Sequence, residues 1–360
     1  MTHNIIVTGA GSGGAENLIR SLRNGSLDLR IYGSNMDSFL LAKSSADVRI
    51  SLPGCNEEGY IDNLNRIIDK ENIELIIPNN DSEVGKISQE RNKLSCNIFL
   101  PSNETVQVCQ DKLQLHNALE KSNIHQARSL GIKSLVDIDH FMKTNPGERY
   151  WIRPRRGSGS MGATWVKNSK QAANWIELWV DLRGMKITDF MVSEFLPGRD
   201  YAFQSVWKDG KLLVAKLVER LSYIMARNRL SNMSSSPATA RTLRDENALE
   251  TIFKAIKSVS EIPNGNYNLD LKGRADGIMC VTEFNIGRFC MITPIFDNTG
   301  KYNTAEIHVK AALDMAVDIY DPIDIEEDVY LLRELDTLPT ILRRSEFDKI
   351  IDDSNKWSSN

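Results

Sequence analysis

Two short stretches late in the chain carry oxygen-bearing side chains in a pattern that could bind a metal ion. Asn268-Leu-Asp270 and Glu283-Phe-Asn285 each place two such side chains two residues apart. Alternate residues of a β-strand share a face, so each pair would project in one direction. If the two strands are neighbours, Asp270, Glu283 and Asn285 converge as hard oxygen ligands suited to Mg²⁺ shared with phosphates. The alternative is that both pairs are solvated residues at a strand edge.

A basic, glycine-rich segment precedes these pairs and could contact the phosphates. It reads Arg153-Pro-Arg-Arg-Gly-Ser-Gly-Ser-Met-Gly162. Gly157 and Gly162 have the spacing of a P-loop, but Ala163 stands where that motif requires lysine, which excludes a P-loop. A flexible loop with free backbone N–H groups and three arginines beside it can instead close over a polyphosphate. The alternative is a basic surface hairpin with a mobile tip.

A second glycine cluster lies near the N-terminus, where Gly9, Gly11 and Gly14 satisfy G-x-G-x-x-G. The motif follows a strand-like run and precedes a helical pattern, as dinucleotide binding requires. An NAD-dependent oxidoreductase is therefore an alternative function, and a tight turn that binds nothing is the structural alternative. The acidic residue expected after the second strand is replaced by Asn35, with Asp37 displaced beyond it, and Tyr-x-x-x-Lys occurs nowhere in the sequence.

The elements that must position these residues change in character near residue 150. Before it, apolar runs alternate with helical patterns, which indicates β-α-β crossovers and a parallel sheet; the strands are predicted at 4–8, 29–33, 74–78 and 97–101. After it, the pattern favours antiparallel strands, predicted at 150–154, 163–166, 191–196, 201–206, 211–220, 267–271 and 278–284. Helices are predicted at 60–71, 110–123 and 246–261, and the region after Asp321 is also helical in pattern.

Length and composition limit the class of protein. The 360 residues suggest two or three domains, and a hydrophobic content of 41% argues against a disordered chain or a fibrous rod. A formal net charge of −4 gives no support to nucleic-acid or membrane partners. Five scattered cysteines without a C-x-x-C pair indicate reduced thiols. With no secretory signal and no apolar run of about 20 residues, we expect a soluble, cytoplasmic protein.

Taken in order, these motifs resemble the ATP-grasp superfamily, most closely the synthetase half of the carbamoyl phosphate synthetase large chain and related single-chain ligases. The matching runs are Asp111-Lys112, Ile152 to Gly162, Ser193 to Gly198 with Asp200, Val218 to Arg220, Asn268 to Asp270, and Glu283 to Asn285 with Arg288. The resemblance implies an α/β (α+β) fold. A Rossmann-like pre-ATP-grasp domain with a parallel sheet would span 1–106. A two-lobed ATP-grasp domain with antiparallel sheets would span 107–325, with its small lid lobe at about 150–196. A C-terminal helical tail would occupy 326–360.

The resemblance also implies ATP and Mg²⁺ as cofactors, with Mn²⁺ as a substitute ion. Lys112 and Arg153 would hold the ATP phosphates, and Arg288 would stabilise the transferred phosphoryl group, so Arg153 and Arg288 are the catalytic candidates. The loop that closes over the phosphates would consist of Gly157, Ser158, Gly159, Ser160, Met161 and Gly162.

The remaining implied roles concern the nucleoside and the metal. Glu194, Phe195 and Leu196 would form a hinge whose backbone hydrogen-bonds the adenine, with Asp200 on the ribose hydroxyls. The metal ligands would be Asp270, Glu283 and Asn285. The sequence departs from the common E-x-N-P-R form of this motif, because Ile286-Gly287 separates Asn285 from Arg288 and adds one residue.

The function that the resemblance implies is ATP-dependent ligation of small molecules. A substrate carboxylate would become an acyl phosphate, which an amine, a thiol or a similar nucleophile then captures; a homodimer is left open. The alternatives are the NAD-dependent oxidoreductase and a non-catalytic ATP-binding protein. Asp81 and Glu83, just beyond Pro78, would orient an amine or else cap the following helix. Ser231 to Ser236 would be a mobile loop over the site or a solvated linker.

Overall fold

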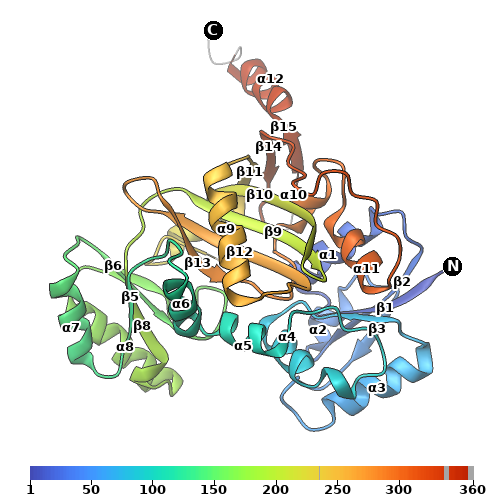
Figure 1. Ribbon diagram of the computed structural model, residues 1–360, viewed down its shortest axis with the longest axis horizontal. Helices are drawn as coiled ribbons and strands as arrows, with labels where there is room; N and C mark the ends of the chain where they lie inside the picture. Colours follow the sequence, from blue (N-terminus) through green and yellow to red (C-terminus); the bar gives the residue numbers. More distant parts are fainter. Residues whose placement is uncertain (235, 336–339, 356–360) are drawn as a thin grey trace.

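Three sheets organise the protein (Figure 1). The computed structural model describes residues 1–234, 236–335 and 340–355. A parallel sheet near the N-terminus is followed by two antiparallel sheets, which confirms the predicted mixed α/β class. The domain boundaries at 106 and 325 stay predictions.

The N-terminal region is built on a four-stranded parallel sheet. Its strands are β1 (His3–Thr8), β2 (Leu29–Asn35), β3 (Val48–Ser51) and β4 (Leu75–Ile77), in the spatial order β3-β2-β1-β4. Its helices are α1 (Gly13–Arg23), α2 (Ser38–Ala42), α3 (Tyr60–Glu71), α4 (Asp81–Gln89) and α5 (Asn103–Gln110). Ile5, Ile6 and Val7 are completely buried because α1 packs on one face of the central strand and α3 on the other.

The sequence prediction was wrong at one strand of this sheet and missed another. Among the described residues, the segment predicted as a strand at 97–101 makes a single bridge, from Asn97 to Leu75. Beyond it Leu100 is buried in the core, and Pro101 has no N–H to offer a ladder. The fourth strand is instead β3, at the other edge. In β3 only Val48 and Ile50 are partly buried, so the apolar pattern that could predict this strand consists of two residues.

The glycine turn between β1 and α1 is required by packing. Gly11 has φ +84°, and a Cβ there would lie 1.7 Å from the carbonyl oxygen of Leu40 in α2. Asn35 donates its side-chain N–H to the Ala10 carbonyl at 2.7 Å, and Asp37 caps α2 through its side chain. The Asn35 side chain is therefore engaged in the turn and the Asp37 side chain in the helix cap, and neither is positioned to bind the ribose of a dinucleotide.

A small four-stranded antiparallel sheet carries the basic glycine loop. Its strands are β5 (Ser129–Gly131), β6 (Tyr150–Pro154), β7 (Thr164–Val166) and β8 (Phe190–Glu194), in the order β5-β8-β6-β7, with α7 (Leu135–Thr144) and α8 (Ser169–Arg183) packed on it. The predicted hairpin is confirmed, because β6 pairs antiparallel with β7. The Trp175 indole N–H donates to the Gly162 carbonyl at 2.9 Å, which anchors one end of the loop.

The large sheet has seven strands in the order β13-β12-β9-β10-β11-β14-β15. They are β9 (Asp200–Lys208), β10 (Lys211–Tyr223), β11 (Pro237–Thr242), β12 (Gly265–Gly273), β13 (Met279–Phe284), β14 (Val329–Leu332) and β15 (Thr340–Arg343). Alternation separates its faces: Phe203 and Leu217 pack toward α6 (Lys112–Lys121) and α9 (Glu246–Val259). On the other face lie α10 (Thr293–Asp297) and α11 (Thr304–Ala312). Short 3-10 turns occupy Arg91–Lys93, Ile187–Asp189 and Ala226–Asn228.

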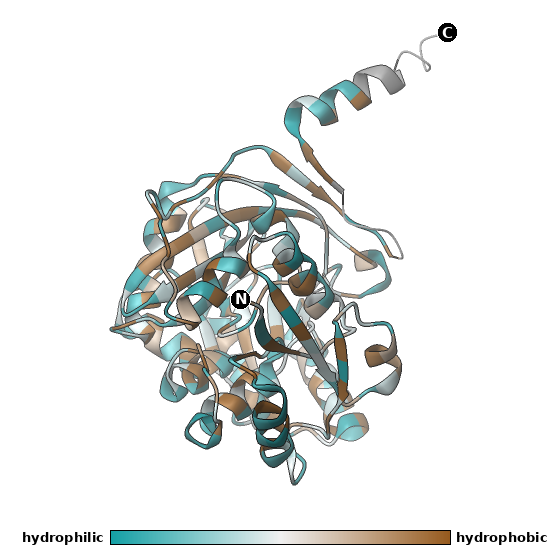
Figure 2. Cartoon of the chain, turned by 90° about the vertical axis from the view of Figure 1, so that its right-hand side faces the viewer, coloured by the Kyte–Doolittle hydropathy of each residue, from teal (hydrophilic) through white to brown (hydrophobic). Residues whose placement is uncertain are grey.

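The C-terminal segment differs from the helical tail predicted for 326–360. β14 pairs with β11, and β15 pairs with β14, before α12 (Arg344–Asn355) begins. Val329 and Leu331 are buried, and Leu331 joins the core of the large sheet, so tertiary pairing overrides the helical pattern of this stretch. The helix α12 extends away from the body of the chain (Figure 1, Figure 2).

In the part of the chain that the structure describes, no helix is both long enough and apolar enough to cross a bilayer.

We predict that Gly11→Ala destabilises the fold more than Gly184→Ala. Both residues have positive φ, which costs an alanine about 1 kcal/mol. Open space surrounds the Cβ position of Gly184, whereas Gly11 abuts the α2 backbone, and such overpacking adds about 1–3 kcal/mol. The urea midpoints of both variants and the wild type measure the difference. Equal midpoints for the two variants would show that α2 does not pack on the turn in solution.

Candidate functional site

A cavity of about 400 Å³ is lined by residues of the two antiparallel sheets, by their connecting segments and by residues that follow β1 and β4 of the parallel sheet. The predicted site residues that line it are Lys112, Arg153, Gly157, Ser158, Gly159, Ser160, Met161, Glu194, Phe195, Leu196, Asp200, Asp270, Glu283, Asn285 and Arg288. Gly162 does not line the cavity, because it packs against Pro154 and Trp179 at the base of the loop. We refer to this cavity as the cleft.

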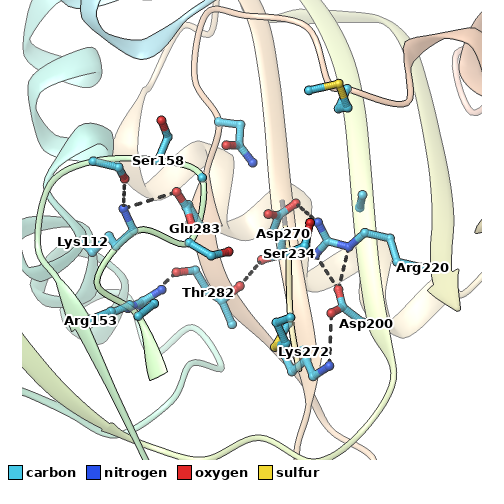
Figure 3. Close-up of a pocket in the computed structure, with 18 of the residues that line it drawn as sticks. Lys112, Arg153, Ser158, Asp200, Arg220, Ser234, Asp270, Lys272, Thr282 and Glu283 are labelled. Carbon is cyan, nitrogen blue, oxygen red and sulfur yellow. Dashed lines mark hydrogen bonds and ion pairs between the residues drawn. The ribbon is translucent and has the colours of Figure 1, made fainter. Parts of the chain in front are cut away.

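The predicted metal ligands lie on the last two strands of the large sheet. β12 and β13 pair so that Asp270 lies directly opposite Glu283, and the Asn285 N–H donates to the Asn268 carbonyl just beyond. Each of the two carboxylates forms an ion pair with a basic side chain (Figure 3). Asp270 Oδ1 lies 3.0 Å from Arg220 Nη1, and Glu283 Oε1 lies 3.3 Å from Lys112 Nζ. The adjacency predicted from strand alternation is present.

Lys112 connects the metal-ligand candidate Glu283 to the glycine loop. It is the first residue of α6, whose N-cap is Asp111. Its Nζ also donates to the Gly157 carbonyl at 2.7 Å. Asp111 in turn pairs with Arg155 at 2.8 Å, so the helix start and the loop start are held together.

The side chain of Arg153, which lines the cleft, reaches from β6 to the backbone of β13. Its Nη2 donates to the Thr282 carbonyl at 3.1 Å, while its buried Nε has no hydrogen-bond partner among the described residues. Burial lowers the pKa of this guanidinium, and the charge of Glu283 opposes the shift. A buried cation with an unused donor suits an anionic ligand.

The hinge candidates follow β8. The Glu194 carboxylate is bound by Arg128, whose Nε and Nη2 lie 2.9 and 2.6 Å from Oε2. The Arg149 guanidinium lies 5.6 Å from the centre of the Phe195 ring. Because the Glu194 side chain is occupied, the backbone of this segment is what remains for a base, as the resemblance implies.

Asp200 is buried among three partners that sequence reasoning did not assign. Its carboxylate holds Arg220, accepts from the Tyr223 hydroxyl, and lies 3.1 Å from Lys272 Nζ (Figure 3). Burial opposes ionisation, but Arg220 and Lys272 outweigh it and lower the pKa of Asp200. Both carboxylate oxygens thus have partners in the protein, and the ribose role stays a prediction. Strand alternation could have found Lys272, which lies two residues beyond Asp270.

Asp81 and Glu83 separate in the structure. The helix α4 is capped by Asn80, whose side chain accepts from the Glu83 N–H at 2.9 Å. Glu83 is held by Thr8 and Tyr60 away from the cleft, and burial raises its pKa. Asp81 lines the cleft and binds Arg288, so neither carboxylate caps the helix.

The serine-rich segment that follows β10 covers part of the cleft. Met233 and Ser234 line it, and Arg229 Nη1 donates to the Gly159 carbonyl at 3.2 Å. The described part of 231–236 is therefore placed as a loop over the site, next to the glycine loop, rather than as a linker.

Comparisons with known proteins agree with this architecture. Residues 5–99 match the family model described as the PylC-like, N-terminal domain. Similar solved structures include an L-amino acid ligase from Bacillus licheniformis (TM-score 0.68, 12% identity, 91% of this chain and 78% of that chain). Another is an N5-carboxyaminoimidazole synthetase from Staphylococcus aureus complexed with ADP (TM-score 0.70, 13% identity, 98% and 86%). A third is the biotin carboxylase domain dimer of Hydrogenobacter thermophilus 2-oxoglutarate carboxylase, in complex with MgADP, ADP and bicarbonate (TM-score 0.70, 13% identity, 91% and 73%). A search of curated proteins finds no match.

The chain therefore shares the ATP-grasp fold of these structures, and its residues 5–99 resemble a PylC-like N-terminal domain. At 12–13% identity these likenesses establish the fold and leave the chemistry to the residues of the cleft.

We predict that Arg220→Met destabilises the protein by about 3–5 kcal/mol at neutral pH, because it leaves Asp200 and Asp270 buried without their shared cation. The loss is larger at pH 8 than at pH 5. Burial already raises the pKa of Asp270, and Arg220 opposes that rise. A carboxyl whose pKa is raised on folding loses stability as pH rises through the interval between its unfolded and folded values.

Urea unfolding of the wild type, Arg220→Met and Arg220→Lys at both pH values measures this effect. The lysine variant keeps the charge and is expected to recover part of the loss. A methionine variant with the same stability deficit at pH 5 and pH 8 would contradict the assigned ion pairs.

Proposed function

We propose that the protein is an ATP- and Mg²⁺-dependent ligase that activates a substrate carboxylate as an acyl phosphate for attack by an amine, a thiol or a similar nucleophile. The observation that carries the proposal is the pair Asp270 and Glu283, facing each other at a cleft that also holds Lys112, Arg153 and Arg220. Paired carboxylates beside several cations match the charge pattern of a metal–polyphosphate complex.

The residues present fit a divalent metal. Among the described residues there is no group of three or more His, Cys, Asp or Glu side chains that could hold one. The ion would therefore be held by two carboxylates, the Asn285 amide oxygen and the phosphates, which are the hard donors that Mg²⁺ prefers. When bound, Mg²⁺ or Mn²⁺ would neutralise charge on the phosphates.

The protein side chains would then bind and orient the reactants. Lys112 and Arg153 would hold the phosphates, and Arg288 would face the charge that develops on the transferred group. The loop from Gly157 to Gly162 would exclude water. The backbone of Glu194 to Leu196 would take the adenine, with Asp200 at the ribose.

The internal ion pairs suggest how the cleft could accept such a ligand. Lys112 and Arg220 neutralise Glu283 and Asp270 in the structure. With the ligand bound, Asp270 and Glu283 would hold the metal ion and Lys112 and Arg220 would pair with phosphate oxygens, so that no charge is left buried without a partner.

The reaction class draws support from the structural relatives. These relatives are an L-amino acid ligase, an N5-carboxyaminoimidazole synthetase and a biotin carboxylase domain. We extend to this chain a small-molecule carboxylate and a small-molecule nucleophile as substrates, and a cytoplasmic location. The carbamoyl phosphate synthetase-like subtype and a homodimer are parts of the same proposal.

One assay decides the reaction class: ADP release by the purified protein with Mg²⁺–ATP across a library of amino acids and other carboxylates. Turnover that requires a carboxylate and a nucleophile supports the ligase. ATP binding without turnover would favour the non-catalytic nucleotide-binding alternative. Fluorescence titration with NADH against ATP–Mg²⁺ separates the oxidoreductase, which the proposal expects to show no NADH binding.

We predict that Glu283→Gln lowers the Mg²⁺-dependent rate of ADP formation by roughly 10²–10³-fold, because the amide removes one charged metal ligand. The change also removes the charge that pairs with Lys112, so the unfolding midpoints of the variant and the wild type are measured and their rates are compared where both are folded. Glu250→Gln, on the exposed face of α9, is the matched control and should leave the rate unchanged. Undiminished metal-dependent turnover in Glu283→Gln would rule out the metal assignment.

A further inference from the structure

The extra residue between Asn285 and Arg288 has a defined place in the fold. Gly287 has φ +72°, and a Cβ on it would lie 2.9 Å from Val84 Cγ1 and 3.0 Å from Leu100 Cδ2. Its N–H donates to the Asn266 carbonyl at 3.0 Å. The segment after β13 is therefore pressed against α4 of the N-terminal region, in a backbone conformation that glycine adopts without strain.

This turn delivers Arg288 to a carboxylate of the N-terminal region. Arg288 Nε lies 2.5 Å from Asp81 Oδ1, and Nη2 donates to the Asn285 amide oxygen. Two of the three guanidinium nitrogens are thus held by partners, which fixes the plane of the group. Both Arg288 and Asp81 line the cleft.

Asp81 also faces a second cation of the cleft. Burial opposes its ionisation, but Arg288 and Lys112 outweigh it, so the pKa of Asp81 is lowered. Its position in the first turn of α4 also favours a negative charge. A charged carboxylate on α4 is therefore favoured beside the segment that follows β13.

We propose that Asp81 is a positioning residue, which orients the Arg288 guanidinium toward the cleft. In this chain it compensates for the added residue before Arg288, because the guanidinium takes its direction from α4 instead of from a short connection to Asn285. The inference rests on the proposed function, in which Arg288 meets the transferred phosphoryl group.

A double-mutant cycle tests the role toward Arg288. Asp81→Ala should lower kcat for Mg²⁺-dependent ADP formation roughly 10- to 100-fold with little change in KM for ATP, since a group misplaced by about 1 Å can cost this much. Asp81→Asn keeps a hydrogen-bond acceptor and should lose less. In the Arg288→Ala background, Asp81→Ala should have no further effect. An equal loss in both backgrounds would overturn the inference and point to direct contact between Asp81 and a substrate amine.

Urea unfolding tests the contact between Asp81 and Arg288 without any turnover. Asp81→Ala and Arg288→Ala should each lower the urea midpoint, and the double variant should lose less than the sum of the two single losses, because either change already breaks the pair. Asp69→Asn, an exposed carboxylate of α3, is the control and should not change the midpoint. Strictly additive losses would overturn the inference.

The two assays separate this inference from the proposed function. Wild-type protein that makes no ADP with any substrate would refute the ligase proposal, and the urea cycle alone would then decide whether Asp81 holds Arg288. Wild-type turnover with an unimpaired Asp81→Ala variant would leave the ligase standing and overturn this inference. Urea midpoints of all variants ensure that folded proteins are compared.

Discussion

The cleft depends on one electrostatic constraint: two carboxylates that face each other on neighbouring strands must be neutralised. The pairing of β12 with β13 sets Asp270 opposite Glu283. Taking each charge out of water costs several kcal/mol unless an opposite charge is close. The chain supplies Arg220 from β10 and Lys112 from α6. Burial still raises the pKa of Asp270, with Arg220 opposing the rise. Arg220 reaches Asp270 from a strand of the same sheet, whereas Lys112 reaches Glu283 from the start of a helix.

The same constraint limits what the cleft can accept. Lys112 also binds the glycine loop, and Arg220 also binds Asp200, so the carboxylates are connected to segments far apart in the sequence. A neutral ligand that displaced either pair would leave a buried charge unpaired. A ligand that brings both an anionic polyphosphate and a divalent cation replaces every internal pair with an equivalent one. The proposed metal–nucleotide complex meets this requirement, because it brings both kinds of charge together.

Sequence reasoning succeeded where a local period or a dense motif determines the outcome. Strand alternation was enough to place Asp270 beside Glu283, and the change from parallel to antiparallel strands followed the pattern of apolar runs. It failed where long-range pairing decides, as at β3 and in the strands after Asp328. The partners of Asp200 and Arg288 lie on other elements, so the spacing of residues within one element cannot predict them.

The two glycine motifs show how the structure separates residues that look alike in sequence. At Gly11 the space that a side chain would occupy is filled by the α2 backbone, and the neighbouring polar groups bind one another. At Gly157 and Gly159, nothing among the described residues comes within 4 Å of the Cβ position, although both line the cleft. Glycine in the first motif answers a packing demand inside the protein. At Gly157 and Gly159 no described protein atom requires glycine, so the demand comes from freedom of the backbone or from close approach of a ligand, and a loop that closes over phosphates needs both.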